Sequence, residues 1–348
     1  MTNLSCCSSS VVPTACLLLC AALVTRMTIK TAKTKDKSLS QLPVAVLLFG
    51  PTASGKTGLS LPLAQQFGGE IINADSRQVY RHMPIITAMP EPHEFAAAPH
   101  HLFDFLEPDQ ALSAVAWGGL AVRAARDIWA RNKVPFFVGG TGFYLKYLTD
   151  GLSPIPPTDS ATLEGLMAEV NAVGLAALYG ELEQADPVLA ARLAPGDTHR
   201  IVRGLAVVRT TGVPLSVWQE KPVEKPVAAR FIKLALCPPR EVLYKRIHDR
   251  FDTMLSNGLV AEVEAVFARG YLPTLPALTS IGFPVYFEAL EGRMSLDAAH
   301  EKVLQHMRNY AKRQTTWLRR SYHPDHVFDS ADAAEAAGWL EERLASRA

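Results

Sequence analysis

Three short segments in the first half of the chain are rich in apolar residues, and each ends at a glycine or a polar turn. They are VAVLLFG at 44–50, EIINADS at 70–76 and VPFFVGG at 134–140. Continuous apolar runs of this length are typical of strands that are buried on both faces. Helical spacing follows over 57–67 and over 113–132, with Ser113 as a candidate N-cap. This alternation predicts an α/β fold in which a parallel sheet is flanked by helices.

The pattern changes after the proline-rich segment 151–160. A helical pattern rich in Ala, Leu and Glu continues without a strand to about residue 193, and we interpret it as a helical insertion. The apolar run 231–237 then returns to strand character and should rejoin the sheet. Further helices are expected over 199–210, 241–269 and 295–320.

The first predicted strand leads directly into Gly50-Pro51-Thr52-Ala53-Ser54-Gly55-Lys56-Thr57, which fits the phosphate-binding pattern G-x-x-x-x-G-K-[ST]. A strand before this motif and a helix after it are the context that a P-loop requires. Backbone N–H groups in such a turn form an anion nest, and the helix N-terminus adds partial positive charge. Lys56 would supply a point charge, and Thr57 could bind Mg²⁺. The motif predicts a P-loop NTPase-like core that grips a phosphate, but it does not identify the reaction.

These patterns divide the chain into five segments. They are a disordered tail or over-extended start at 1–40, the first part of the core at 41–155, the helical insertion at 156–195, the second part of the core with a basic last helix at 196–330, and a terminal helix or tail at 331–348. The apolar stretch 11–24 is not typical of a signal peptide, because no Lys or Arg precedes it. It is also shorter than a membrane-spanning helix usually is. The cysteines have neither disulfide nor zinc spacing. We therefore expect a cytoplasmic protein without a membrane partner.

Two polar residues follow predicted strands at the edge where ligands of open α/β sheets bind. Asp75 ends the second strand, and it is either a general base that faces an acceptor or a capping or Mg²⁺-linked carboxylate. Thr141 follows the third strand within the segment GGTG. The glycines there would let a ligand approach closely, and they would equally suit a tight turn.

Local charge must indicate any nucleic-acid partner, because the formal net charge is only +1. Arg200 and Arg203 share a helix face at a spacing of three, and Arg246 and Arg250 share one at a spacing of four. The last long helix carries a basic stripe formed by Arg308, Lys312, Arg313, Arg319 and Arg320. Such a stripe could follow RNA phosphates or could be solvated cover over a core.

Taken together, these motifs resemble those of the bacterial tRNA dimethylallyltransferase family, also called tRNA isopentenyltransferases. In the family's order the chain contains GPTASGKT, NADSRQVYRHM, APHHLFD, VPFFVGGTGFYLKYLTDGLSP, DTHRIVRGLAVVRTTGVPLS, RIHDRFDTML and AKRQTTWLR. The resemblance extends from about residue 44 to residue 318. The P-loop alone is moderately specific, whereas the ordered series is highly specific.

The resemblance implies transfer of a dimethylallyl group from dimethylallyl diphosphate to N6 of the adenosine on the 3′ side of the tRNA anticodon. On this basis the P-loop would hold the diphosphate, with Mg²⁺ bound through Thr57. Asp75 would accept a proton from the attacking amine. Thr141 and Arg250 would stabilise the leaving diphosphate together with Lys56.

The resemblance also implies two tRNA-contacting segments, Asp75-Ser76-Arg77-Gln78 and His199-Arg200-Ile201-Val202-Arg203. The insertion would face the anticodon stem-loop, the target base would flip out of its stack, and the enzyme would act as a monomer. Two segments depart from the family's pattern. The family's G-T-A-K-P reads Ile86-Thr87-Ala88-Met89-Pro90 here, with Met89 in place of the lysine. The family's I-G-Y-[KR]-[EQ] reads Ile281-Gly282-Phe283-Pro284-Val285, with Pro284 in place of the basic residue. Loss of the basic residue at Pro284 predicts either weaker tRNA affinity or tighter tRNA selectivity.

Three other functions share parts of this pattern. An adenylate isopentenyltransferase acting on free AMP or ATP would use the same loop and base but would need no tRNA surface. A small-molecule P-loop kinase would need an adenine site and usually an arginine-rich lid, and no segment clearly supplies them. A non-catalytic nucleotide-binding adaptor would tolerate the loss of Asp75. The helical insertion and the basic segments favour tRNA as the acceptor.

Overall fold

The computed structural model of the protein describes residues 42–279 and 282–345. These residues belong to one compact unit that starts at Leu42. The tail or over-extended start expected at 1–40 lies outside the described residues. Within the described part, no helix combines the length and the apolar character that a membrane span requires.

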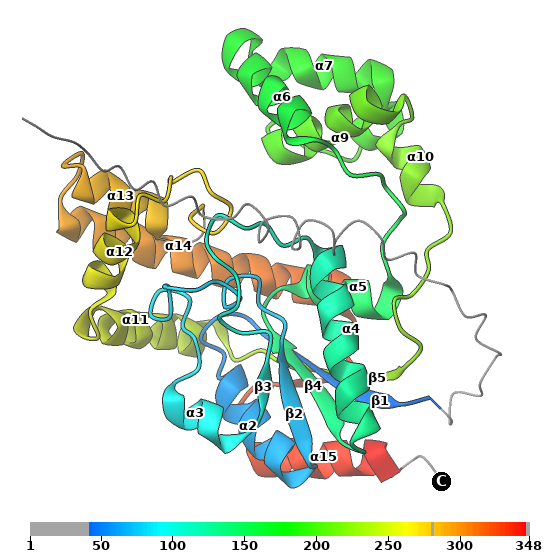
Figure 1. Ribbon diagram of the computed structural model, residues 1–348, viewed down its shortest axis with the longest axis vertical. Coiled ribbons are helices and arrows are strands. Elements are labelled where there is room, and N and C mark those ends of the chain that lie inside the picture. The colour runs from blue at the N-terminus through cyan, green and yellow to red at the C-terminus, as the bar shows by residue number, and fades with distance from the viewer. Residues whose placement is uncertain (1–41, 280–281, 346–348) are drawn as a thin grey trace, which may run out of the picture. The chain divides into compact units, whose positions relative to one another are not determined.

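The described residues form a parallel sheet of six strands in the order β3-β2-β4-β1-β5-β6 (Figure 1). The strands are β1 (Val44–Phe49), β2 (Gly69–Asn73), β3 (His100–His101), β4 (Val134–Gly139), β5 (Arg230–Leu236) and β6 (His326–Phe328). All adjacent pairs are parallel, so the carboxyl ends of the strands share one edge of the sheet. The predicted α/β sheet is confirmed, and the short outer strands β3 and β6 are added to it.

Strand β1 is buried on both faces because helices cover each side of the sheet. Its odd-numbered residues point into a core shared with α4 (Ala114–Ala130) and α5 (Gly142–Asp150). Its even-numbered residues point into the opposite core, with α2 (Lys56–Gln66) and α15 (Ala333–Ala345). This arrangement explains the unbroken apolar run in the sequence. The expected cap of α4 is also present, since the Ser113 hydroxyl accepts a hydrogen bond from the third N–H group of that helix.

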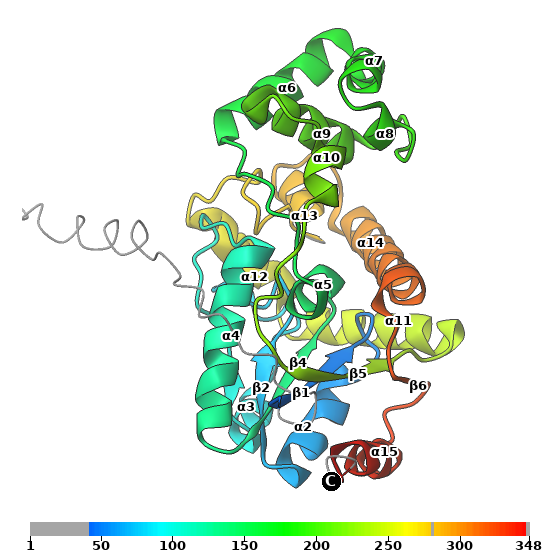
Figure 2. The same cartoon turned by 90° about the vertical axis from the view of Figure 1, so that its right-hand side faces the viewer.

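The helices that follow α5 pack around a core of their own (Figure 2). They are α6 (Ser160–Val173), α7 (Leu175–Ala185), α8 (Pro187–Ala190), α9 (Thr198–Thr211) and α10 (Leu215–Glu220). The buried Asp186 carboxylate joins α8 to α10, because it accepts hydrogen bonds from the N–H groups of Leu189 and Ser216. The sequence pattern placed the end of the insertion at residue 195. The helical group instead continues through α9 and α10, because the apolar face of α9 is buried in the same core.

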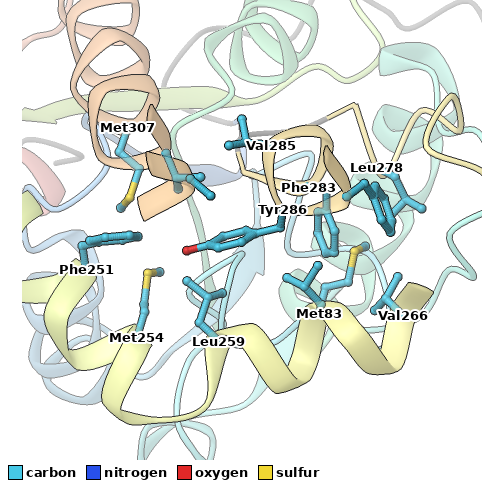
Figure 3. Close-up of a cluster of buried hydrophobic side chains, with 14 of the residues drawn as sticks. Met83, Phe251, Met254, Leu259, Val266, Leu278, Phe283, Val285, Tyr286 and Met307 are labelled. Carbon is cyan, nitrogen blue, oxygen red and sulfur yellow. The ribbon is translucent and has the colours of Figure 1, made fainter. Parts of the chain in front are cut away.

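A third group of helices surrounds another core, in which Figure 3 shows the ring of Tyr286 among methionine, leucine and phenylalanine side chains. Its helices are α11 (Arg240–Ser256), α12 (Leu259–Ala268), α13 (Phe283–Leu290) and α14 (Leu296–Trp317). The single helix expected over 241–269 is divided at Gly258, whose left-handed φ of 91° interrupts helical geometry. Helix α14 is the predicted basic helix, and five residues in π-helical conformation extend it to Tyr322.

Because the core of the helical group holds α9, Leu205→Ala should lower the free energy of unfolding by about 2–5 kcal/mol, the usual cost of truncating a buried leucine. Urea denaturation followed by circular dichroism measures this change. Val173→Ala removes a side chain that is 63% exposed at the end of α6. This control should change the unfolding free energy by less than about 0.5 kcal/mol. Equal effects of the two substitutions would contradict the packing described for α9.

Candidate functional site

The loop between β1 and α2 has the conformation of an anion-binding turn. Ala53 and Gly55 have left-handed φ angles of 60° and 99°, and α2 begins at the next residue, Lys56. The Lys56 ammonium reaches back over the loop and donates a hydrogen bond of 2.9 Å to the carbonyl of Pro51. The expected P-loop is therefore formed between a buried strand and a helix N-terminus.

Ser54 lies within this loop and is fully buried. Arg246 of α11 donates a hydrogen bond of 2.8 Å to the Ser54 carbonyl, which fixes the loop to α11. The Ser54 hydroxyl has no hydrogen-bond partner among the described residues.

The ammonium group of Lys56 is strongly desolvated. Burial lowers its pKa to about 8, while the Asp75 carboxylate opposes this shift and the Arg250 guanidinium adds to it. Burial likewise lowers the pKa of Arg250. Two neighbouring half-buried cations repel each other, and an anion placed between them would relieve that repulsion. The electrostatics of the loop therefore favour a negatively charged ligand.

Asp75 lies two residues beyond β2, in a turn that buried polar groups hold in place. The Asn73 side chain accepts a hydrogen bond of 2.8 Å from the Asp75 N–H and donates one of 2.9 Å to the Leu102 carbonyl. Oδ1 of Asp75 accepts a hydrogen bond of 2.9 Å from the Arg77 N–H. No hydrogen bond reaches Oδ2 from within the described part of the chain. The second carboxylate oxygen is therefore available to a ligand.

Thr141 supports the same turn from the end of β4. Its hydroxyl oxygen accepts a hydrogen bond of 2.9 Å from the Ser76 N–H, and the hydroxyl donates one of 3.2 Å to the Ser76 side chain. The resemblance placed Thr141 at the leaving diphosphate. In the structure its hydroxyl bonds the turn that holds Asp75. Thr141 therefore positions Ser76 and, through it, Asp75. The contact with the diphosphate stays a prediction.

Asp75 lines two cavities, and the larger of these two, about 360 Å³ in volume, lies beside the P-loop and is hereafter called the large cavity. Basic and hydroxyl side chains line much of it, namely Thr52, Lys56, Thr57, Ser60, Arg246 and Arg250. The segment 87–91 and Glu94 of α3 (Pro92–Ala97) form another wall. Asp75 lines this cavity too. The structure thus brings together candidate site residues from three separate segments of the sequence, namely Lys56 and Thr57, Asp75, and Arg250.

A second cavity of about 170 Å³, the small cavity, adjoins the large one. Four residues line both cavities, namely Thr52, Asp75, Thr87 and Ala88. Its other walls come largely from α11 and α14 and include Met254, Met307, Tyr310, Arg77 and Arg313. Burial raises the pKa of the Tyr310 hydroxyl, and the nearby Asp75 carboxylate adds to this effect. Asp75 therefore stands where the two cavities meet.

Three side chains fix the segment that borders both cavities. Gln78, expected at the tRNA, donates a hydrogen bond of 2.6 Å to the Ala88 carbonyl, and Arg250 donates a longer one of 3.5 Å to the same oxygen. Glu262 of α12 accepts hydrogen bonds from the two backbone N–H groups at positions 85 and 86. No sequence motif marks Glu262 for this role. Met89 lines the large cavity, so that wall lacks the positive charge that the family's lysine would give it.

A third cavity of about 720 Å³, the basic groove, is lined by residues of α9 and α14. Arg200 comes from α9, and Lys312, Arg313 and Arg320 come from α14 and the turn after it. Arg313 also lines the small cavity, so the basic groove extends to the neighbourhood of Asp75. Positive charge along a groove of this size suits an anionic polymer.

The segment of α9 that was expected to contact tRNA has only some of its side chains at the surface. His199 and Arg200 are exposed, and Arg203 is half-buried. Ile201 and Val202 are buried in the core of the helical group. The expectation of an RNA contact does not hold for the side chains of Ile201 and Val202, because the helical period turns them inward.

Clusters of three or more His, Cys, Asp or Glu side chains suited to a metal ion are absent from the described residues. The neighbouring histidines of β3 have structural partners, since His101 bonds the Glu70 carboxylate at 2.8 Å and His100 bonds the Ala98 carbonyl at 2.7 Å. Thr57, the predicted Mg²⁺ ligand, lines the large cavity. A divalent ion held there would take most of its ligands from a bound diphosphate and from water.

Comparison with protein families identifies prenyl transferases. The family model described as IPP transferase matches residues 78–321, and the one described as Isopentenyl transferase matches residues 43–101. The tRNA dimethylallyltransferase of Parvibaculum lavamentivorans is 46% identical over 275 residues, which cover 79% of this chain and 87% of that protein. The tRNA dimethylallyltransferase of Xanthomonas oryzae pv. oryzae is 41% identical over 319 residues, which cover 88% of this chain and 97% of that protein.

Solved structures show the same likeness. The tRNA isopentenylpyrophosphate transferase of Bacillus halodurans matches with a TM-score of 0.64 and 31% identity, over 88% of this chain and 97% of that chain. A eukaryotic dimethylallyltransferase acting on tRNA matches with a TM-score of 0.74 and 25% identity, over 88% of this chain and 80% of that chain. The likeness therefore covers the sheet and most of the helices described above.

The lowered pKa of Lys56 predicts that anion binding weakens at alkaline pH. Below about pH 8 the ammonium is charged and attracts a phosphate group, whereas above that pH binding must first take up a proton. The affinity for inorganic diphosphate, measured by isothermal titration calorimetry, should fall by up to about tenfold per pH unit above this pKa.

The control for the ligand's own ionisation is Lys56→Met, which should bind diphosphate more weakly at neutral pH and should lack the alkaline fall. A wild-type affinity that runs parallel to that of the variant through the alkaline range would contradict the position assigned to Lys56.

Proposed function

The chain belongs to the IPP transferase family of tRNA dimethylallyltransferases, and we propose that it transfers the dimethylallyl group of dimethylallyl diphosphate to N6 of the adenosine on the 3′ side of the tRNA anticodon. The observation that carries this proposal is the position of Asp75, which lines both the large and the small cavity. A carboxylate at such a junction can serve a reaction between a diphosphate bound on one side and a base bound on the other.

The large cavity suits the diphosphate of the donor. Backbone N–H groups of the P-loop and the N-terminus of α2 attract an anion, and Thr52, Gly55 and Thr57 of the loop line this cavity. Lys56 and Arg250 would stabilise the negative charge that develops on the leaving diphosphate. Mg²⁺ would be held by the Thr57 hydroxyl and by oxygen atoms of the donor, and it would add to this charge neutralisation.

The small cavity suits the adenine base. Met254 and Met307 give it apolar surface, and Tyr310 gives it an aromatic ring of the kind on which unstacked bases pack. A base that is stacked in an anticodon loop would have to leave its stack to reach Asp75. We therefore propose that the base of the target adenosine rotates out of its stack and enters this cavity.

In the proposed reaction, the N6 amine attacks C1 of the dimethylallyl group. The N6–C1 bond forms as the bond between C1 and the diphosphate oxygen breaks, and a proton of the amine passes to the Asp75 carboxylate. Oδ2 is the oxygen suited to receive it, because Oδ1 already accepts the hydrogen bond from the Arg77 N–H. Asp75 later returns the proton to water, and diphosphate leaves the large cavity.

The basic groove suits the phosphate backbone of the tRNA. Arg200 would approach the RNA from the helical group, while Lys312 and Arg320 would approach it from α14. Arg313 lines both this groove and the small cavity, so it would lie where the RNA delivers the base. Pro284 lines a neighbouring cavity with Arg313 and contributes no charge there, so tRNA binding would depend more heavily on the groove.

Incubation with labelled dimethylallyl diphosphate tests the proposed acceptor. Unmodified tRNA, AMP and ATP are offered in separate reactions, and the product that carries the label is identified. We expect label in tRNA alone. Label in AMP or ATP alone would support an adenylate isopentenyltransferase. Phosphate transfer from ATP to a metabolite without prenyl transfer would support a kinase, and either outcome would contradict the proposal.

Asp75→Ala should lower the rate of prenyl transfer by about 10²-fold or more, the usual scale for the loss of a general base. The affinity for dimethylallyl diphosphate should be retained, because the P-loop is intact. Single-turnover transfer and calorimetric donor binding measure the two quantities. Asp109→Ala, at an exposed carboxylate outside both cavities, is the matched control. Normal turnover of the Asp75 variant would refute the role of this residue.

Neutral substitutions in the basic groove should weaken tRNA binding and reduce its salt dependence. Arg200→Ala and Arg320→Ala should each lower the slope of log Kd against log salt concentration by about 1, the change expected for one lost phosphate contact. Filter binding at several salt concentrations gives the slope. Lys245→Ala, at an exposed lysine paired with Asp249 on α11, should leave it unchanged. A groove variant with the wild-type slope would show that the substituted residue does not contact an RNA phosphate.

A further inference from the structure

Gln314 of α14 joins two of the loops that form the site. Its side-chain oxygen accepts a hydrogen bond of 2.8 Å from the Thr52 N–H, and its side-chain nitrogen donates one of 2.9 Å to the Gly140 carbonyl. Gln314 is only 6% exposed, and its hydrogen bond to Gly140 is buried. The oxygen and the nitrogen of one buried amide group thus each bond a backbone group of the site.

An amide is the side-chain group that matches this position. The Thr52 N–H needs an acceptor and the Gly140 carbonyl needs a donor, and a primary amide presents both from one planar group. A Cβ atom at Gly140 would lie 2.2 Å from the amide nitrogen of Gln314, so a larger residue there would displace this amide. The donor and the acceptor of the Gln314 amide, as well as its size, therefore match the groups around it.

The two residues that Gln314 joins belong to the two parts of the proposed site, the P-loop and the turn that holds Asp75. Thr52 belongs to the P-loop and lines both cavities. Gly140 precedes Thr141, whose hydroxyl accepts the hydrogen bond from the N–H of Ser76, the residue after Asp75. A continuous series of bonded groups therefore runs from the P-loop through Gln314 to the turn that holds Asp75.

The same turn of α14 also contributes to the basic groove. Lys312, Arg313 and Thr316 line that groove, and so does Gln314. The helix that would contact the RNA is thus the helix that sets the distance between Thr52 and Gly140.

We propose that Gln314 is a positioning residue for prenyl transfer. It fixes the spacing between the diphosphate cradle of the P-loop and the Asp75 turn, and it makes that spacing depend on α14. This inference rests on the proposed function, which assigns the cradle to the donor and Asp75 to the acceptor. Gln314 itself touches neither of the reacting atoms. A side chain that served only as packing would be replaceable by an apolar one of the same size.

Gln314→Met distinguishes positioning from packing, because methionine has a similar length and volume but forms neither hydrogen bond. The kcat for prenyl transfer should fall and the Kd for inorganic diphosphate should rise, each by about tenfold or more. The KM for tRNA should change by less than about twofold, because the groove side chains are untouched. Wild-type kcat and diphosphate affinity would overturn the proposal. A fall in kcat with comparable rises in the Kd for diphosphate and in the KM for tRNA, together with a lowered melting temperature, would also overturn it. That pattern would indicate general damage to packing.

Gln314→Glu gives a second test through pH. A protonated carboxyl group can accept from the Thr52 N–H and donate to the Gly140 carbonyl, whereas the carboxylate cannot donate. The ratio of variant to wild-type diphosphate affinity should be near one at mildly acidic pH and should fall by about tenfold or more at alkaline pH. Gln305→Glu places the same charge at an exposed position of α14 and should keep its ratio within about twofold. A ratio for Gln314→Glu that does not change with pH would overturn the proposal.

The binding of inorganic diphosphate requires no tRNA, so these tests are separable from the test of function. If the wild-type protein fails to prenylate tRNA while the Gln314 variants bind diphosphate as predicted, the proposed function fails and the bridge to the P-loop stands. If the wild-type protein prenylates tRNA and the variants bind and react normally, the function stands and the role of Gln314 is overturned.

Discussion

The proposed chemistry depends on one carboxylate being held rigidly where two cavities meet. The Asn73 side chain bonds the Asp75 N–H, and the Thr141 hydroxyl bonds the N–H of the next residue. These partners come from the ends of β2 and β4, and β4 lies beside β1, which carries the P-loop. The sheet thus fixes the position of Asp75 relative to the P-loop, and this fixed spacing is what a near-attack geometry requires.

The positive charge of this site is concentrated at two places, the large cavity and the basic groove. The formal net charge of +1 conceals half-buried cations at the large cavity and exposed ones along the basic groove. Burial lowers the pKa of Lys56 and that of Arg250, and the Arg250 guanidinium lowers that of Lys56 further, so holding both charges here costs free energy. A diphosphate relieves that cost, and it becomes more negative as it leaves. The same arrangement therefore favours donor binding and bond cleavage.

The local parts of the site could be predicted from the sequence, because each is a contiguous motif between elements of clear periodicity. The P-loop and Asp75 are examples. The partners that hold these motifs could not be predicted, since Gln314 meets Gly140 across 174 residues and Arg246 meets Ser54 across 192. Strands β3 and β6, with two and three residues, are too short to show a period of two. The motif that contains Ile201 identified a helix correctly but could not indicate which of its faces is buried.

The most direct test of this account is a crystal structure of the Asp75→Asn variant with dimethylallyl diphosphate and an anticodon stem-loop RNA. We predict that the diphosphate lies on the backbone N–H groups of the P-loop and that the flipped adenine occupies the small cavity. Its N6 atom should lie about 3 Å from the side chain of residue 75. An adenine bound in the large cavity, or a diphosphate bound away from the P-loop, would contradict the central claim.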